Sequence, residues 1–220
     1  MNKRIYSYFV AHFQSNEIRV KNRSSKMFDK ACKFLRERGV YLSPQDLGHI
    51  QPLTRCKVVP KHTIIMHQGK PVTKLYFLNS GIVHLFRTHQ GIDHTLGIVS
   101  SNEFVSTPLY LLNGQPSSCA LETLTEVEVL EWGKPQVEEI KRLVPKAYDM
   151  ELVLMDRVLN WVQDHQIDAH CLTAEERYHK IMQQQPEILN TIPLKYVASL
   201  LGIHQDSLSR IRKQYGQKMA

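Results

Sequence analysis

Residues 192–213 read IPLKYVASLLGIHQDSLSRIRK, and this stretch decides how the rest of the chain is interpreted. Pro193 suits the first turn of a helix, where a missing backbone N–H costs nothing. Gly202 can adopt the positive φ that ends a helix in a tight turn. The pattern therefore predicts two helices joined by a three-residue turn. The apolar side chains that would pack between these helices are Val197, Ala198, Leu201, Ile203, Leu208 and Ile211.

Polar and basic side chains dominate the outer face of the second predicted helix. In a helix-turn-helix unit the second helix enters the DNA major groove, where Gln, Arg and Asp can recognise base edges. The candidates for base contacts are Gln205, Asp206, Ser207, Ser209 and Arg210. The candidates for phosphate contacts, which position a protein without reading sequence, are Arg212, Lys213 and Lys195. A helical hairpin with a basic surface is the alternative interpretation.

Positive charge gathers at the two ends of the chain. The 220 residues carry a net charge of +7, with six basic and one acidic residue in 1–26 and four basic and one acidic in 204–220. Basic segments attract polyanions and favour phosphate contacts, although a solvated run of charges is also common. The apolar fraction of 42% is that of an ordinary globular protein, so a sizeable core can be buried.

Short apolar runs separated by turn residues fill the first half of the chain. Even spacing of such runs indicates an antiparallel sandwich or barrel. A helix over 28–38 and a second helix capped by Ser43, with Pro44 at its first position, precede them. The expected strand regions are 63–66, 74–78, 82–87, 95–99 and 121–132.

One long helix is expected from about Pro145 to Gln166. Apolar residues three and four positions apart form a stripe along it, and a second apolar set widens the surface. Such a helix needs more than one packing partner, so one side can rest on the β domain and the other on a second subunit. Packing within the monomer is the alternative. The residues expected at the dimer interface are Met150, Leu154, Val158 and Trp161.

Several classes of protein are disfavoured by the sequence. The longest apolar runs are a few residues, well short of the roughly 20 of a membrane-spanning helix, and the N-terminus does not read as a secretory signal. Four separated cysteines predict reduced thiols and a cytoplasmic location. No phosphate loop, nucleophile elbow or zinc-protease signature supports an enzyme.

The stretch from Pro193 to Ile203, with Leu208 to Lys213, resembles the helix-turn-helix of Crp/Fnr-type transcription regulators, and is most like the branch common in Bacteroidetes. The order of segments from about Met27 onward agrees with that family. The resemblance implies an α+β fold: an N-terminal antiparallel β-roll of the cyclic-nucleotide-binding type, a long dimerisation helix and a C-terminal helix-turn-helix. The expected divisions are a basic leader (1–26), a sensor domain (27–144), the dimerisation helix (145–168) and the DNA-binding domain (169–220).

Two departures from the family pattern concern the DNA-binding end. The family's recognition helix often carries an Arg-Glu-x-x-x-Arg pattern, which falls here on Gln205, Asp206 and Arg210, so only Arg210 is retained. The family usually continues into a β wing, but only residues 214–220 follow, which predicts a reduced or absent wing. The implied partners are double-stranded DNA, a second copy of the chain and an unknown small-molecule effector, with RNA polymerase as a further candidate.

The effector site departs from the pattern as well. Cyclic-nucleotide-binding members use a Gly-Glu pair and a downstream Arg-Ser or Arg-Thr pair, whose arginine balances the cyclic phosphate. The matching positions, taken as a tentative ligand pocket, are Ser106, Thr107, Ser117 and Ser118. Because a buried phosphate without a cation is costly, cAMP is not expected to bind in the usual way. No resident cofactor is predicted.

Metal-based sensing was the remaining alternative for the effector. Cys32 stands alone at the end where iron–sulfur relatives cluster their cysteines. Histidines spaced around a turn are usually exposed to solvent, so no metal site is predicted. The candidate metal ligands are His62, His67, His84, His89, His94, His165 and His170, with Cys171. The sequence thus predicts a homodimeric, sequence-specific transcription regulator. A ligand-binding or protein-interaction module with a vestigial helix-turn-helix is the alternative.

Overall fold

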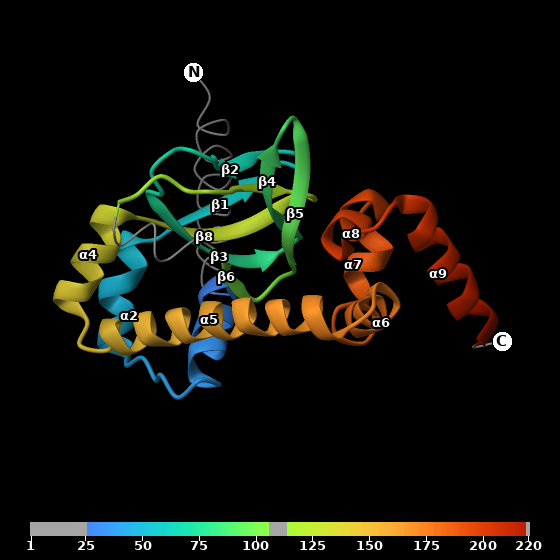
Figure 1. Ribbon diagram of the computed structural model, residues 1–220. Helices are drawn as coiled ribbons and strands as arrows, with labels where there is room; N and C mark the ends of the chain where they lie inside the picture. The colour runs from blue at the N-terminus through green and yellow to red at the C-terminus, as the bar shows by residue number, and fades with distance from the viewer. Residues whose placement is uncertain (1–25, 106–113, 219–220) are drawn as a thin grey trace, which may run out of the picture.

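A computed structural model describes residues 26–105 and 114–218. Two four-stranded antiparallel sheets form a β-roll, with strand orders β1-β8-β3-β6 and β2-β7-β4-β5 (Figure 1). All pairs of neighbouring strands are antiparallel. The strands are β1 (Arg55–Val59), β2 (Ile64–Met66), β3 (Lys74–Ser80), β4 (Val83–His89), β5 (Ile92–Val99), β6 (Glu103–Val105), β7 (Ala120–Thr123) and β8 (Val127–Gly133).

Two tight turns fix how β3, β4 and β5 follow one another. Gln90 and Gly91 link β4 to β5 with φ values of 51° and 76°, and a type I′ hairpin turn needs positive φ at both positions. Gly81 links β3 to β4 with φ of 90°, and a β-carbon there would lie 2.4 Å from the carbonyl oxygen of Glu126. Both turns coincide with the glycine-containing breaks that separate the expected strand regions.

Alternate side chains of the first sheet enter two different cores. Tyr76, Leu78 and Val129 face the second sheet and form the interior of the roll. Phe77 and Leu130 point the other way, into a core shared with the helices that cover the outer face. This alternation follows from the two-residue period of a strand, and it leaves the first sheet buried on both sides.

Helices cover the outer face of the first sheet. The N-terminal described helix spans 26–36 and is followed by α2 (Pro44–Ile50) and the 3₁₀ turn η1 (Gln51–Leu53). Ser43 caps α2 through a reciprocal capping box with Asp46, as the Ser-Pro pair predicted. After β8, α4 (Lys134–Leu143) leads into α5 (Ala147–Cys171), which runs along the roll in Figure 1. The long helix therefore begins close to the expected start and continues five residues beyond the expected Gln166.

A helical C-terminal region lies at the far end of α5, beside strands β4 and β5 (Figure 1). Thr173 begins it with a capping box to Glu176, and Pro186 separates its first two helices, as predicted. One core joins this region to the roll, because Ile82, Ile98 and Leu124 cluster with its buried side chains. The helices are α6 (Ala174–Gln184), α7 (Pro186–Thr191), α8 (Leu194–Leu201) and α9 (Gln205–Lys218).

The predicted fold class, an α+β chain with an antiparallel β-roll followed by a helical region, is confirmed. Strands β1 and β6 were not predicted, and the expected 121–132 strand region is two strands, β7 and β8. Residues 214–218, which follow the predicted recognition helix, are still part of α9. Among the helices that the structure describes, none has the length and apolar character needed to cross a bilayer.

Candidate nucleic-acid interface and sensor cavities

The turn between α8 and α9 has the geometry that the sequence predicted. Gly202 adopts φ of 67° and ψ of 30°, the left-handed conformation. Its backbone N–H donates to the carbonyl of Ser199 at 3.1 Å, and the N–H of Ile203 donates to the carbonyl of Ala198 at 3.0 Å. This pair of hydrogen bonds is a Schellman motif, which stops α8 and redirects the chain into α9.

Buried apolar side chains lock the two helices together. Val197, Ala198 and Leu201 on α8 are buried, as is Leu208 on α9. Arg177 on α6 reinforces the end of α8 by donating from Nη2 to the carbonyl of Leu201 at 2.8 Å. The helix pair is thus held at a fixed angle, which leaves the opposite face of α9 available to a partner.

The outer face of α9 carries the side chains that the sequence singled out. Of these, Ser207 is half-buried and the others are exposed; the exposed ones on α9 are Gln205, Asp206, Ser209, Arg210, Arg212 and Lys213. Lys195, at the start of α8, is also exposed, with its ammonium 4.8 Å from the ring centroid of Tyr196. Exposed positive charge is therefore present on both helices of the unit, at Lys195 on α8 and at Arg210, Arg212 and Lys213 on α9.

The cations that the structure describes on α9 are not neutralised by other described residues. Among the described residues, no carboxylate lies within ion-pair distance of Arg210, Arg212 or Lys213. Asp206 is close instead to His204, at 3.3 Å, and both side chains are exposed. Unpaired arginines at the surface can bind phosphates or base edges without first breaking an internal ion pair.

Helix α5 presents two apolar rows, and the structure assigns them to different surroundings. Met150 and Leu154 of the predicted dimer stripe pack against the core under the first sheet, and Val158 is half-buried. Trp161 lies on β5, where a β-carbon added to Gly97 would be 2.5 Å from Cζ2 of the indole. The predicted stripe thus contacts its own chain, and the exposed apolar row of α5 is a different one.

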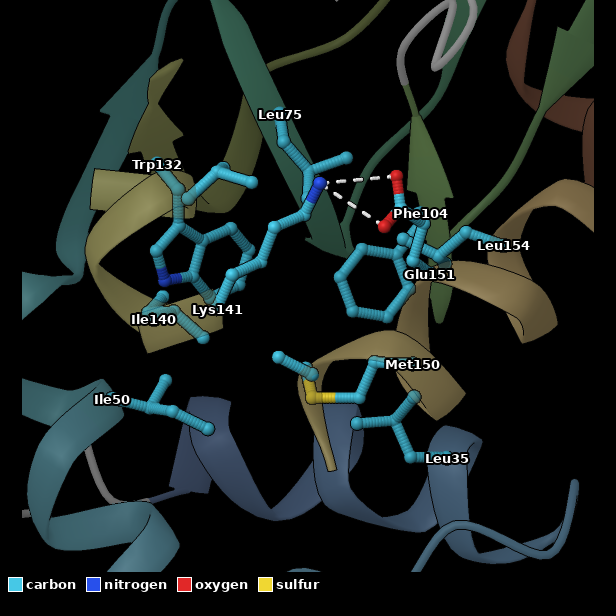
Figure 2. Close-up of a pocket in the computed structure, with 12 residues that line it drawn as sticks. Leu35, Ile50, Leu75, Phe104, Trp132, Ile140, Lys141, Met150, Glu151 and Leu154 are labelled. Atoms are coloured by element: carbon cyan, nitrogen blue, oxygen red, sulfur yellow. Dashed lines mark hydrogen bonds and ion pairs between the residues drawn. The ribbon is translucent and has the colours of Figure 1, made fainter. Parts of the chain in front are cut away.

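A small apolar cavity lies where α5 meets the roll. Its volume is about 80 Å³, below the 300–1,000 Å³ typical of pockets for small-molecule ligands. Figure 2 shows Lys141 and Glu151, paired at 3.0 Å, on the wall of an otherwise apolar lining that includes Met150 and Trp132. The cavity is a packing gap between α5 and the β-roll, and it is too small for a metabolite.

Two of the four residues of the predicted ligand pocket, Ser117 and Ser118, lie in the part of the chain that the structure describes. Ser106 and Thr107 lie outside the described residues. The buried Ser117 hydroxyl donates to the carbonyl of Cys119 at 2.8 Å and accepts from its amide at 3.3 Å, while Ser118 is exposed. The Ser117 hydroxyl is therefore engaged with its own backbone. Burial raises the pKa of the Cys119 thiol, although its hydrogen bonds with Ser117 and Ser118, and then the charge of Arg87 on β4, act in the opposite direction.

His84 is buried, which contradicts the expectation that the histidines around this hairpin are exposed. Its Nε2 lies 2.8 Å from a Glu122 oxygen, and its ring meets the ring of Tyr196 on α8 edge-on at 4.8 Å. Docking of the helical region removes His84 from solvent, whereas His89 and His94 remain exposed. Within the described residues, no three His, Cys, Asp or Glu side chains gather as metal ligands would.

Comparisons with known proteins agree with this architecture. Residues 56–142 match the family model of the cyclic nucleotide-binding domain. The cyclic AMP receptor protein of Thermus thermophilus is 25% identical over 179 residues, which cover 77% of this chain and 81% of the relative.

Solved structures share the fold at low sequence identity. FixK2 of Bradyrhizobium japonicum has a TM-score of 0.65 at 14% identity, covering 75% of this chain and 85% of that one. A transcriptional regulator from Eubacterium rectale, assigned to the Crp/Fnr family, has a TM-score of 0.63 at 16% identity and covers 80% and 85%. Residues 56–142 are therefore similar to a cyclic nucleotide-binding domain, and the chain shares the overall fold of these two solved structures.

Proposed function

We propose that this chain is a sequence-specific DNA-binding transcription regulator that acts as a homodimer, with α9 as its base-reading helix. The observation that carries the proposal is the α8–Gly202–α9 unit, whose Schellman turn holds a helix with unpaired cations facing solvent. Such a helix fits the major groove with its N-terminal residues toward the base edges. The likeness to the cyclic AMP receptor protein supports a regulator rather than an enzyme.

The exposed row of α5 supports a second copy of the chain as the partner. Its exposed members are Tyr148, Leu152, Leu159 and Val162. With the half-buried Met155, they follow one another at alternating steps of four and three residues. That mean spacing of 3.5 residues is the repeat of a coiled-coil seam. Leu152 and Leu159 are 68% and 67% exposed in the single chain, and an exposed apolar row of this kind marks an interaction surface. Pairing of two α5 helices would bury the row and relate two α9 helices by a two-fold axis.

The effector is proposed to be something other than cAMP bound in the usual way. Neither Ser117 nor Ser118 supplies the cation that a cyclic phosphate requires, and the Ser117 hydroxyl is already engaged. Saturable micromolar binding of cAMP in isothermal titration would contradict this. RNA polymerase stays a candidate partner, and the cytoplasm stays the expected location.

A binding selection tests the main proposal against a module with a vestigial helix-turn-helix. The full-length chain is incubated with a random pool of DNA duplexes, and the retained sequences are measured by fluorescence anisotropy at several salt concentrations. A regulator is expected to enrich a two-fold symmetric sequence and to bind it more tightly than random duplex, with affinity falling steeply as salt rises. Equal, weak binding to every duplex would contradict the proposal.

A further inference from the structure

A second and larger cavity opens at the end of the β-roll. Its volume is about 410 Å³, within the range of pockets that hold small metabolites. Strands β1, β2, β3, β7 and β8 and the 67–73 connection all contribute to its lining. Neither Ser117 nor Ser118 lines it, so it is separate from the described part of the predicted ligand pocket.

The polar side of this cavity is strongly basic. Lys57, Lys70 and Lys74 line it together with His67, and Glu131 is its single acidic residue. With histidine neutral, these lining side chains carry a formal net charge of +2. Lys70 makes no ion pair with any described residue, and two ammonium groups share the one carboxylate.

Glu131 acts as an internal anion for two of these lysines. Its side chain is 5% exposed, and its carboxylate lies 2.8 Å from Nζ of Lys57 and 3.2 Å from Nζ of Lys74. Burial raises the pKa of Glu131, but the hydrogen bonds from the two lysines outweigh it and hold the pKa below its usual range. The two lysine side chains are 39% and 43% exposed, so both ammonium groups can be reached from the cavity.

The remaining walls are apolar. Buried Met66, Val72 and Leu121 line the cavity, with Tyr76 beside them. The Tyr76 hydroxyl donates to the carbonyl of Ile65 at 3.4 Å, so this polar atom is directed into the protein's own backbone. A ligand suited to these walls needs a compact apolar body joined to an anionic group.

We propose that this cavity binds a small organic phosphate monoester, with its phosphate among Lys57, Lys70 and Lys74 and its apolar body against Met66, Val72 and Leu121. The net charge of the lining matches a dianion, and lysine ammonium groups bind phosphate as point charges. A carboxylate would leave one positive charge uncompensated. The cavity would thus give the sensor domain a ligand site beyond the cyclic-nucleotide position.

Isothermal titration of the full-length chain with phenyl phosphate tests the proposal, with phenol, benzoate and inorganic phosphate as separate probes. We expect saturable binding of phenyl phosphate, weaker binding of benzoate and inorganic phosphate, and no binding of phenol. Equal binding of benzoate would overturn the assignment of a phosphate, and tight competition by cAMP would overturn the assignment of a separate monoester site. Absence of saturable phenyl phosphate binding would overturn the site itself.

Three variants locate the binding. Lys70→Met removes a cation that makes no internal ion pair, so the fold should persist, and affinity should fall by at least about fivefold, the effect of one unit charge roughly 4 Å away in water. Glu131→Gln removes the carboxylate that pairs with Lys57 and Lys74, so it should tighten the binding of phenyl phosphate. A cavity with only a structural role would show no such gain in affinity. Lys61→Met changes an exposed lysine outside the lining and serves as the control. Equal affinities for all three variants would overturn the proposal.

Discussion

Ser199 on α8 accepts a hydrogen bond from the backbone amide of Thr95 on β5, at 2.9 Å. One turn earlier on α8, Tyr196 packs its ring on buried His84 of β4. The first helix of the proposed DNA-binding unit is therefore held against the β4–β5 hairpin of the roll in the same chain. In this arrangement a shift of β4 and β5 must be accommodated by α8, so the two regions are mechanically connected.

Ser199→Ala should loosen this connection. The substitution leaves the amide of Thr95, a buried residue, without its partner, which costs about 1–3 kcal/mol of unfolding free energy. Hydrogen exchange at β5 should accelerate, as measured by mass spectrometry. Ser209→Ala is the matched control, because among the described residues that hydroxyl donates to the carbonyl of Gln205 in its own helix and not to the roll. Equal exchange at β5 in both variants would show that the contact contributes nothing.

Gly97→Ala should displace Trp161. The added methyl would lie 2.5 Å from Cζ2 of the indole, so the aromatic ring or strand β5 must move. Overpacking of this kind costs about 1–3 kcal/mol, measured by urea unfolding with tryptophan fluorescence as the signal. Gly48→Ala is the control, since nothing lies within 4 Å of that added methyl and alanine favours the helix. A Gly97→Ala protein as stable as the control would contradict the close contact.

The features that depend on neighbouring residues in sequence could be predicted. The turn at Gly202, the caps at Ser43 and Thr173 and the break at Pro186 each follow from the conformational preferences of a few adjacent residues, and all were found. Strand β1 was missed because its apolar residues do not mark its buried face: Cys56 and Val58 are exposed, whereas the half-buried Lys57 pairs with Glu131.

Features set by tertiary docking could not be predicted. Two apolar rows on α5 have similar composition, and only the position of the roll decides that Met150 and Leu154 face inward while Leu152 and Leu159 face solvent. His84 is buried because a distant helix packs on it. The basic cavity joins Lys57, Lys74 and Glu131, which are far apart in sequence, so no local motif marks it.

Leu159→Glu should convert the proposed dimer to a monomer. A glutamate in the middle of the seam would be buried without a partner, at a cost of several kcal/mol per ion. Asn160→Glu places the same charge on the adjacent exposed position outside the seam and should leave the dimer intact. Light scattering during size exclusion gives the masses of both variants. A dimeric Leu159→Glu protein would rule out this row as the interface.

Acid should destabilise the fold partly through His84. Burial lowers the pKa of His84, although its hydrogen bond to Glu122 acts in the opposite direction. The unfolded chain therefore takes up this proton first, and stability falls as pH drops from the unfolded value near 6.5 toward the lower folded value. Urea unfolding at about pH 7.5 and about pH 5.5 measures the loss. His84→Gln should reduce it, whereas His89→Gln, exposed on the same strand, should not.

Arg210→Ala and Lys213→Ala should weaken DNA binding in different ways. Arg210 lies near the N-terminal part of α9 and is assigned to a base edge, so its loss should cost roughly 1–3 kcal/mol on the selected sequence and reduce the preference over random duplex. Lys213 lies further along the helix and is assigned to a phosphate, so its loss should weaken binding to all duplexes alike and lower the salt dependence by about one unit. Fluorescence anisotropy on both duplexes separates the effects. If Arg210→Ala kept the full preference for the selected sequence, α9 would not be reading bases through this residue.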